Sequence, residues 1–183
     1  MTKRKIDYYN EKGSVVLQAK YRASTSGTNL PFTVIKKLFS YALSTIARWI
    51  PVSSVRIMLQ RWRGVVIGKN VFLGANVVLD NAYPEHITIH DDCSIAGDVY
   101  ILTHSNPKKH FSGLFESYVY TVEIKRGAWI GIGSIILPGV TIGEYSVVSA
   151  GSVVSSSIPP YSIVKGNPAR IVTTFPPELI TIK

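Results

Sequence analysis

A six-residue repeat of aliphatic residues runs through most of the chain and constrains its fold more than any other feature. Its members form three in-phase blocks: Ile67, Leu73 and Leu79; Ile89, Ile95 and Ile101; and Ile124, Ile130, Ile136, Ile142, Val148 and Val154. Such a repeat is typical of a β-helix, in which each hexad supplies a short strand and a corner and the aliphatic side chains stack inward. The sequence therefore predicts an all-β solenoid with a narrow aliphatic core.

Two smaller features follow the same period. Glycine stands directly after several repeat residues, at Gly68, Gly74, Gly131 and Gly143. We expect tight corners there, because glycine tolerates backbone conformations that other residues avoid. Cys93 falls on a second inward position, four residues after Ile89, so we expect a buried, inert thiol rather than a nucleophile.

The repeat is interrupted twice. Leu79 and Ile89 are ten residues apart, and Ile101 and Ile124 are 23 apart. The second interval predicts an inserted loop over about 102–121, and solenoids tend to carry such insertions on their functional face. The loop contains His104, Asn106 and His110.

Residues 1–63 differ from the rest, with 12 Lys and Arg against 2 Asp and Glu, whereas the remaining residues have 8 against 9. Apolar residues recur at helical spacing from Pro31 to Ile50, Pro51 ends that pattern, and Ser53 or Ser54 can cap a second helix. We expect an N-terminal α-helical extension that packs on the solenoid, or, as the alternative, lies on a membrane surface. No transmembrane or secretory pattern is apparent, so a cytoplasmic protein is expected.

The second half of the chain carries a family resemblance. Its motifs are Ala128-Trp129-Ile130-Gly131, Ile136-Leu137-Pro138-Gly139-Val140-Thr141-Ile142-Gly143, Ser149-Ala150-Gly151-Ser152-Val153-Val154, Ile158-Pro159-Pro160-Tyr161 and Gly166-Asn167-Pro168-Ala169-Arg170. In this order they resemble the hexapeptide-repeat acyltransferase superfamily, in its branch of galactoside, maltose and polysaccharide O-acetyltransferases. The resemblance implies a left-handed parallel β-helix and a homotrimer that binds acetyl-CoA between neighbouring β-helices. We expect a basic extension (1–63), an acyltransferase domain (64–172) and a C-terminal tail (173–183).

The resemblance also implies a histidine general base on the inserted loop. A sugar hydroxyl is a poor nucleophile at neutral pH, and a neutral imidazole can accept its proton as it attacks the thioester. Relatives that read Ile-Leu-Thr-His favour His104 as this base. Other relatives hold the base at the position of Asn106, which cannot act as one, so His110 and the absence of a competent base remain alternatives. Asn106 and His110 are also expected to contact the substrate.

For the cofactor, the resemblance implies contacts from Trp129, Gly131, Ala150, Ser155, Ser156 and Arg170. Trp129 would lie beside the reacting centre, and Arg170 would meet a CoA phosphate. No metal is expected: a zinc-dependent carbonic anhydrase of this fold needs three histidine ligands, and nothing in the spacing of His86, His90 and His104 requires such a site.

These features predict an acetyl-CoA-dependent O-acetyltransferase acting on a saccharide hydroxyl, with a saccharide or lipid-linked saccharide of surface polysaccharide biosynthesis as acceptor. An N-acyltransferase acting on an amino sugar and a non-catalytic β-helix scaffold are the alternatives. No nucleic-acid partner is expected, because the basic charge is not accompanied by a recognition motif.

Overall fold

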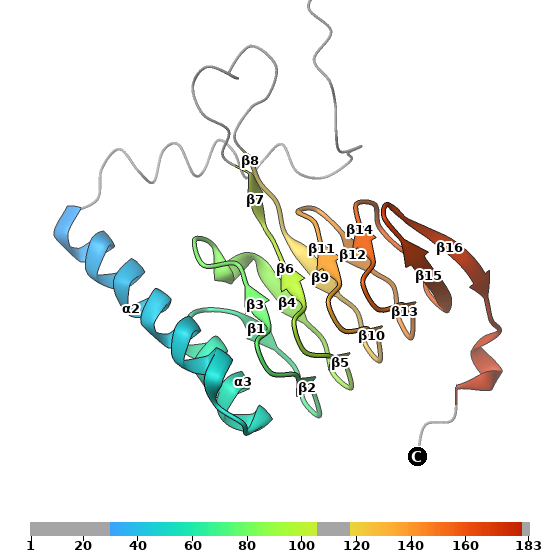
Figure 1. Ribbon diagram of the computed structural model, residues 1–183, viewed down its shortest axis with the longest axis horizontal. Coiled ribbons are helices and arrows are strands. Elements are labelled where there is room, and N and C mark those ends of the chain that lie inside the picture. The colour runs from blue at the N-terminus through green and yellow to red at the C-terminus, as the bar shows by residue number, and fades with distance from the viewer. Residues whose placement is uncertain (1–29, 106–117, 181–183) are drawn as a thin grey trace, which may run out of the picture.

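The computed structural model describes residues 30–105 and 118–180 (Figure 1). Two helices, α2 (Leu30–Trp49) and α3 (Ser53–Trp62), precede a column of short strands that coils as a left-handed β-helix. Three sheets run along the column, and each of the four complete coils contributes one strand to each sheet. The all-β solenoid with an N-terminal helical extension is therefore confirmed.

The three sheets are named A, B and C here. Sheet A holds β1 (Val66–Ile67), β4 (Ile87–Ile89), β9 (Val122–Ile124) and β12 (Thr141–Ile142). Sheet B holds β2 (Phe72–Leu73), β5 (Ser94–Ile95), β10 (Trp129–Ile130), β13 (Val147–Val148), β15 (Ser162–Gly166) and β16 (Ala169–Thr174). Sheet C holds β3 (Val78–Leu79), β6 (Tyr100–Ile101), β11 (Ile135–Ile136) and β14 (Val153–Val154). All pairings within them are parallel except that of β15 with β16.

The aliphatic repeat builds the core as expected. Repeat residues of successive coils lie in register, so that Ile130 pairs with both Ile95 and Val148. All three side chains are fully buried. Because strand side chains alternate, the preceding residue on each strand points outward, and Trp129 is 56% exposed.

The backbone conformation at the corners contradicts our expectation about the glycines that follow the repeat residues. The left-handed backbone conformation occurs three residues after a repeat aliphatic, for example at Asn70, Asp92 and Gly133, with φ of 51°, 61° and 68°. Gly68 and Gly131, directly after the aliphatic residue, lie instead against the backbone of the next coil, where a Cβ atom would collide. Our corner explanation for these glycines was wrong; the close approach of stacked coils requires them.

Cys93 lies inward, as predicted. Its side chain is 1% exposed, and its Sγ lies 3.0 Å from the carbonyl oxygen of Lys125. Burial raises the pKa of the Cys93 thiol to about 11. The thiol is therefore protonated at neutral pH and unsuited to act as a nucleophile.

Helix α3 closes the first coil with three arginines, which we call the arginine cap: Arg56, Arg61 and Arg63. Each places two guanidinium nitrogens within hydrogen-bond distance of the carbonyl of one repeat residue in that coil. Arg61 donates to Ile67 in sheet A at 2.9 and 3.2 Å, Arg56 to Leu73 in sheet B at 2.6 and 2.9 Å, and Arg63 to Leu79 in sheet C at 3.3 Å from both nitrogens. A preceding coil would otherwise supply backbone donors to these carbonyls.

The sequence predicts that Ser53 or Ser54 caps α3, and this prediction is wrong because Ser53 bonds to the first coil instead. The N-cap residue is Val52, and it makes no side-chain capping bond. The hydroxyl of Ser53 accepts a hydrogen bond from the amide of Leu73 at 3.0 Å. Ser53 thus satisfies the first coil rather than its own helix.

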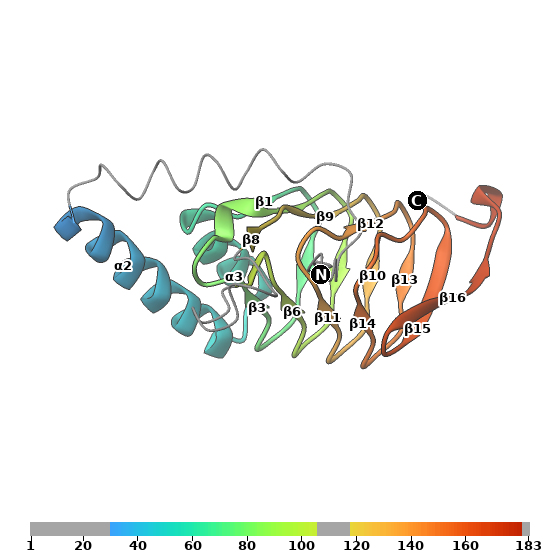
Figure 2. The same cartoon turned by 90° about the horizontal axis from the view of Figure 1, so that it is seen from above.

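The column ends differently at its other extremity. The antiparallel β15–β16 hairpin closes sheet B, and a short 3-10 helix, η3 (Pro177–Leu179), follows it. Figure 2 shows the two helices at one end of the column and β15 and β16 at the other. The hairpin extends to Thr174, across the expected boundary at 172/173, and the division into domains stays a prediction. Within the described ranges no helix is long and apolar enough to cross a membrane.

Candidate active site

The two interruptions of the repeat lie at the same corner of the column, between sheets C and A. The first follows Leu79 and contains a 3-10 turn, η1 (Pro84–His86). The second follows Ile101 and begins with β7 (His104–Ser105), which pairs antiparallel with β8 (Tyr118–Val119) to form what we call the arm. Leu79 and Ile101 are neighbours in sheet C, so the two interruptions meet in consecutive coils.

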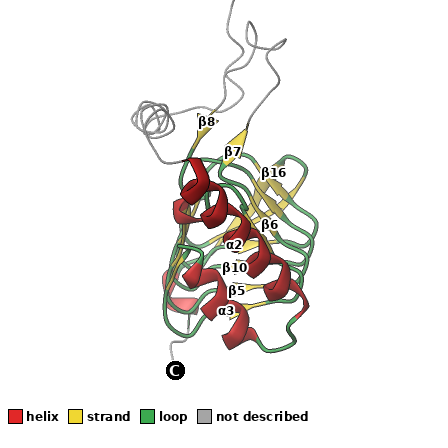
Figure 3. Ribbon diagram, turned by 90° about the vertical axis from the view of Figure 1, so that its left-hand side faces the viewer, coloured by secondary structure: helices red, strands yellow, loops and turns green. Residues whose placement is uncertain are grey.

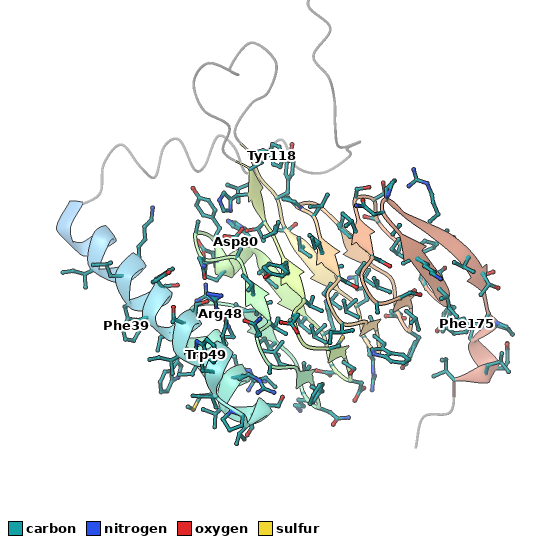
Figure 4. All side chains as sticks on the ribbon, viewed as in Figure 1. Phe39, Arg48, Trp49, Asp80, Tyr118 and Phe175 are labelled. Carbon is teal, nitrogen blue, oxygen red and sulfur yellow. The ribbon has the colours of Figure 1, made fainter. Side chains whose placement is uncertain are left out.

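At this meeting point Asp80 binds His104. The His104 Nδ1 atom lies 2.6 Å from Oδ2 of Asp80, and the Thr103 amide donates to the same oxygen at 2.9 Å. Asp80 is 1% exposed, whereas the side chain of His104 is 34% exposed. Figure 4 shows Asp80 in the coils beneath Tyr118 of the arm. With Nδ1 donating to the carboxylate, Nε2 of His104 is the nitrogen that can accept a proton.

The carboxylate is held in its charged form. Burial opposes ionisation of Asp80, but hydrogen bonds from the amides of Thr103 and Ala82 and from His104 outweigh burial and lower its pKa below the usual value. The other carboxylate oxygen, Oδ1, accepts from the amides of Ala82 at 2.8 Å and Tyr83 at 3.2 Å. A buried carboxylate that accepts this many bonds has a fixed orientation, and so fixes the ring of His104.

Two further side chains hold the pair in place. The ring of Tyr83 meets the His104 ring edge-on, with centroids 5.2 Å apart, and burial together with Asp80 and Glu85 raises the pKa of Tyr83. Arg63 of the arginine cap donates to the backbone carbonyl of Asp80 at 2.8 Å. Burial lowers the pKa of Arg63 to about 10, so its guanidinium remains charged at neutral pH.

Three of the residues expected to bind the cofactor lie together on one part of the surface. Trp129 projects from β10 in sheet B, and Gly131 follows that strand. Gly131 is so close to the backbone of Ala150 in the next coil that a Cβ atom would collide with it. Trp129, Gly131 and Ala150 thus lie along one strip of the surface that crosses two consecutive coils.

The other expected contacts lie apart from this strip. Ser155 and Ser156 follow β14 in sheet C, and Arg170 is exposed on β16, where its Nη1 donates to the carbonyl of Ala169 at 3.1 Å. Asn106 and His110, expected to contact the substrate, lie outside the described residues. The roles of all these residues stay predictions.

The two other histidines of the described residues, His86 and His90, do not join His104 in a metal site. His90 Nε2 lies 2.7 Å from Glu123 Oε1, and the same oxygen accepts from Lys125 Nζ at 2.6 Å. His86 belongs to η1. In residues 30–105 and 118–180, no group of three or more His, Cys, Asp or Glu side chains is placed to hold a metal ion. The carbonic anhydrase alternative therefore finds no ligand set in this part of the chain.

Sequence reasoning missed Asp80, Tyr83 and Arg63. A signal for Asp80 existed: it directly follows Leu79, where Gly68 and Gly74 follow the two earlier repeat residues. A carboxylate at a position that otherwise lies against the next coil must be buried, and buried charges need partners.

Comparisons with known proteins place this architecture in a family. Residues 121–156 match the model of bacterial transferase hexapeptide (six repeats), and residues 64–103 match that of the hexapeptide repeat of succinyl-transferase. A putative acetyltransferase of Staphylococcus aureus (strain COL) is 34% identical over 154 residues, which cover 84% of this chain and 74% of that protein. The chain belongs to the hexapeptide-repeat acetyltransferase superfamily, which confirms the resemblance drawn from the motifs.

Two further relatives are informative. The galactoside O-acetyltransferase of Escherichia coli (strain K12) is 36% identical over 107 residues, covering 58% of this chain and 52% of that enzyme. The chain therefore spans about half the length of that relative. A hexapeptide-repeat acetyltransferase from Vibrio cholerae, solved in complex with acetyl coenzyme A, superimposes with a TM-score of 0.63 at 27% identity, covering 76% of this chain and 87% of that one.

Proposed function

We propose that the protein transfers the acetyl group of acetyl-CoA to a hydroxyl of a saccharide, with His104 as the general base. The observation that carries this proposal is the hydrogen bond between His104 and the buried Asp80 carboxylate at the root of the arm. Membership of the acetyltransferase superfamily supports acetyl transfer, and the galactoside-acetylating relative supports a saccharide acceptor. The Vibrio cholerae neighbour, solved with acetyl coenzyme A, supports the donor.

The chemistry needs no covalent enzyme intermediate. Nε2 of His104 takes the proton of the acceptor hydroxyl while its oxygen attacks the thioester carbonyl. The tetrahedral adduct collapses, the carbon–sulfur bond breaks, and the imidazolium returns its proton to the CoA sulfur. The products are an acetyl ester and CoA thiol. Asp80 keeps Nδ1 protonated as a donor and stabilises the imidazolium that forms.

The proposed donor site takes residues from two protomers of a trimer. A three-sheet column is a three-sided prism, so the corner between sheets C and A lies opposite sheet B. His104 belongs to that corner, while Trp129 faces outward from sheet B. Figure 1 shows the same separation, with the arm at the top of the column and the strands of sheet B along the bottom. If both residues act on one acetyl-CoA molecule, they come from neighbouring protomers.

The central test is release of CoA thiol from acetyl-CoA with a panel of galactosides, glucosides, amino sugars and lipid-linked saccharides. With the preferred acceptor, His104→Ala should lower the turnover number by about 10²- to 10⁴-fold, the usual contribution of a general base. The affinity for acetyl-CoA should stay unchanged, because His104 acts on the acceptor proton.

His90→Ala is the matched control, since His90 also pairs with a carboxylate at 2.7 Å but directly follows β4, away from the interrupted corner. It should keep the turnover of the wild type. Full activity of His104→Ala would overturn the assignment of the base. Turnover with amino sugars alone, giving an amide product, would replace O-acetylation by N-acetylation. Binding without turnover for every acceptor would favour the scaffold hypothesis.

A mixing experiment tests the site between protomers. His104→Ala and Trp129→Ala should each be impaired alone, but mixed trimers should regain about a quarter of wild-type activity, because a random site combines an intact His104 and an intact Trp129 in about one case in four. If mixing restores nothing although the subunits exchange, both residues serve the same protomer or different steps.

A further inference from the structure

Helix α2 exposes an apolar face that the fold does not use. Its members are Ile35, Leu38, Phe39, Ala42, Ile46 and Trp49. Their spacing of three, four and seven residues places them on one side of a helix, and we call this set the outer α2 face. Leu38 is 64% exposed and Trp49 is 85% exposed.

Packing within the protein does not explain this face. Leu43, Ser44 and Ala47 form the buried side of α2, which packs on α3 and β3. An amphipathic helix on the surface of a globular protein needs one apolar stripe toward the core and a polar opposite side. Here the opposite side is apolar as well. Figure 3, which looks onto this end of the molecule, shows α2 and α3 in front of the coils.

The charge around this face has a single sign. No Asp or Glu occurs between Glu11 and Asp80, whereas the same interval contains ten Lys and Arg. Arg56 and Arg63 are buried in the arginine cap and are unavailable to a partner. Lys37 is exposed and Arg48 half-buried; by helical spacing both lie, with Tyr41, on the stripe of α2 between its buried side and the outer α2 face.

Aromatic side chains add a third feature. Phe39 is 58% exposed and Tyr41 56%, and α3 contributes Trp62 at 62%. Aromatic residues beside lysines and arginines suit the boundary between lipid headgroups and acyl chains, where the rings are partly buried and the cations meet anionic headgroups.

We propose that the outer α2 face docks in the plane of an anionic lipid surface. A second copy of the chain is the poorer occupant, because it would bring an equally basic α2 and α3 to this end of the molecule, and these helices contain no carboxylate to pair with the cations. An anionic bilayer supplies both an apolar layer and negative charge. Docking of this kind suits an acceptor carried on a lipid. This link to the acceptor rests on the proposed function, whereas docking itself does not.

The test is co-sedimentation of the full chain with vesicles of phosphatidylcholine, with and without phosphatidylglycerol. The protein should bind the anionic vesicles and be released by salt, since exposed ionic contacts are screened. The double variant Leu38→Gln, Ile46→Gln should lower the partition coefficient by about tenfold or more, because it removes two exposed apolar side chains from the contact. Lys37→Gln should weaken binding by about fivefold.

The matched control is Val172→Gln, Leu179→Gln, which replaces two exposed apolar residues at the far end of the column. It should bind like the wild type, and thermal unfolding should show both double variants folded. Equal binding to neutral and anionic vesicles, or equal binding by Leu38→Gln, Ile46→Gln, would overturn the proposal. So would dissociation of an oligomer by that variant in sedimentation velocity, which would assign the face to a second copy. The assay needs no acceptor and no turnover, so its failure is distinct from failure of the proposed function.

Discussion

The corner between sheets C and A is interrupted in the first two coils and regular in the third. After Ile136 the chain turns through Gly139, with φ of 83°, and enters β12 without an insertion. After Leu79 and after Ile101 it leaves the coil, and the excursions bring together Asp80 and His104, 24 residues apart in sequence. The regular corner serves stacking, and the candidate chemistry lies where the same corner is interrupted twice in succession.

The largest predicted effect on stability lies in the regular coil. Ile136→Ala should lower the free energy of unfolding by about 2–5 kcal/mol, because a fully buried aliphatic side chain leaves a cavity between neighbouring coils. Urea unfolding measures the change. Ile135→Ala, on the same strand but half-buried, should cost clearly less; an equal cost would mean that inward and outward positions are not distinguished as described.

Substitution at the interrupted corner should mainly lower catalytic activity rather than stability. Asp80→Asn should lower the turnover number by about 10²-fold or more, because an amide no longer fixes the tautomer of His104 or stabilises its charged form. The affinity for acetyl-CoA should be unchanged, and measuring both quantities separates positioning from general loss of structure. Parallel loss of turnover and of acetyl-CoA affinity would indicate that Asp80 only supports the fold.

The contrast between the two corners also marks what the sequence could predict. The aliphatic column, both interruptions and the place of His104 follow from a six-residue period, because each coil repeats the same local geometry. The partnership of His104 with Asp80 does not, since it depends on two excursions from consecutive coils meeting in space. In the sequence, Arg56, Arg61 and Arg63 count only toward the basic charge of residues 1–63, because their use as donors depends on where α3 docks.

Backbone conformation gives a smaller and sharper test. Gly139→Ala should cost about 1–2 kcal/mol, since a Cβ is unfavourable at a left-handed φ, although its nearest neighbour there, Tyr120, is 3.5 Å away. Ala82 stands at the corresponding position after Leu79 and is not among the residues with positive φ. Ala82→Gly should therefore destabilise by about 0.5–1 kcal/mol. Thermal unfolding of both variants measures the two changes in stability. Stabilisation by Ala82→Gly would show that the backbone at Ala82 adopts the same left-handed conformation as at Gly139.

The smallest predicted effect is a dependence of stability on pH. The pKa of Asp80 is lowered in the folded protein, so its ionised form stabilises the fold above its unfolded pKa of about 4. This contribution is lost as the pH falls through the lower folded-state pKa. Urea unfolding of the wild type and Asp80→Asn should show a difference in stability that shrinks as the pH falls below about 4. A difference in stability that does not change with pH would contradict the lowered pKa of Asp80 in the folded protein.

The arginine cap has a consequence for how long the molecule can become. A stack of parallel coils offers unpaired backbone at each end, and such edges template the addition of further strands and the growth of filaments. At one end, guanidinium groups occupy the carbonyls of Ile67, Leu73 and Leu79; at the other, an antiparallel strand covers β15. A guanidinium cannot continue a β-ladder, so the same residues that complete the first coil also block the addition of a further coil at that end.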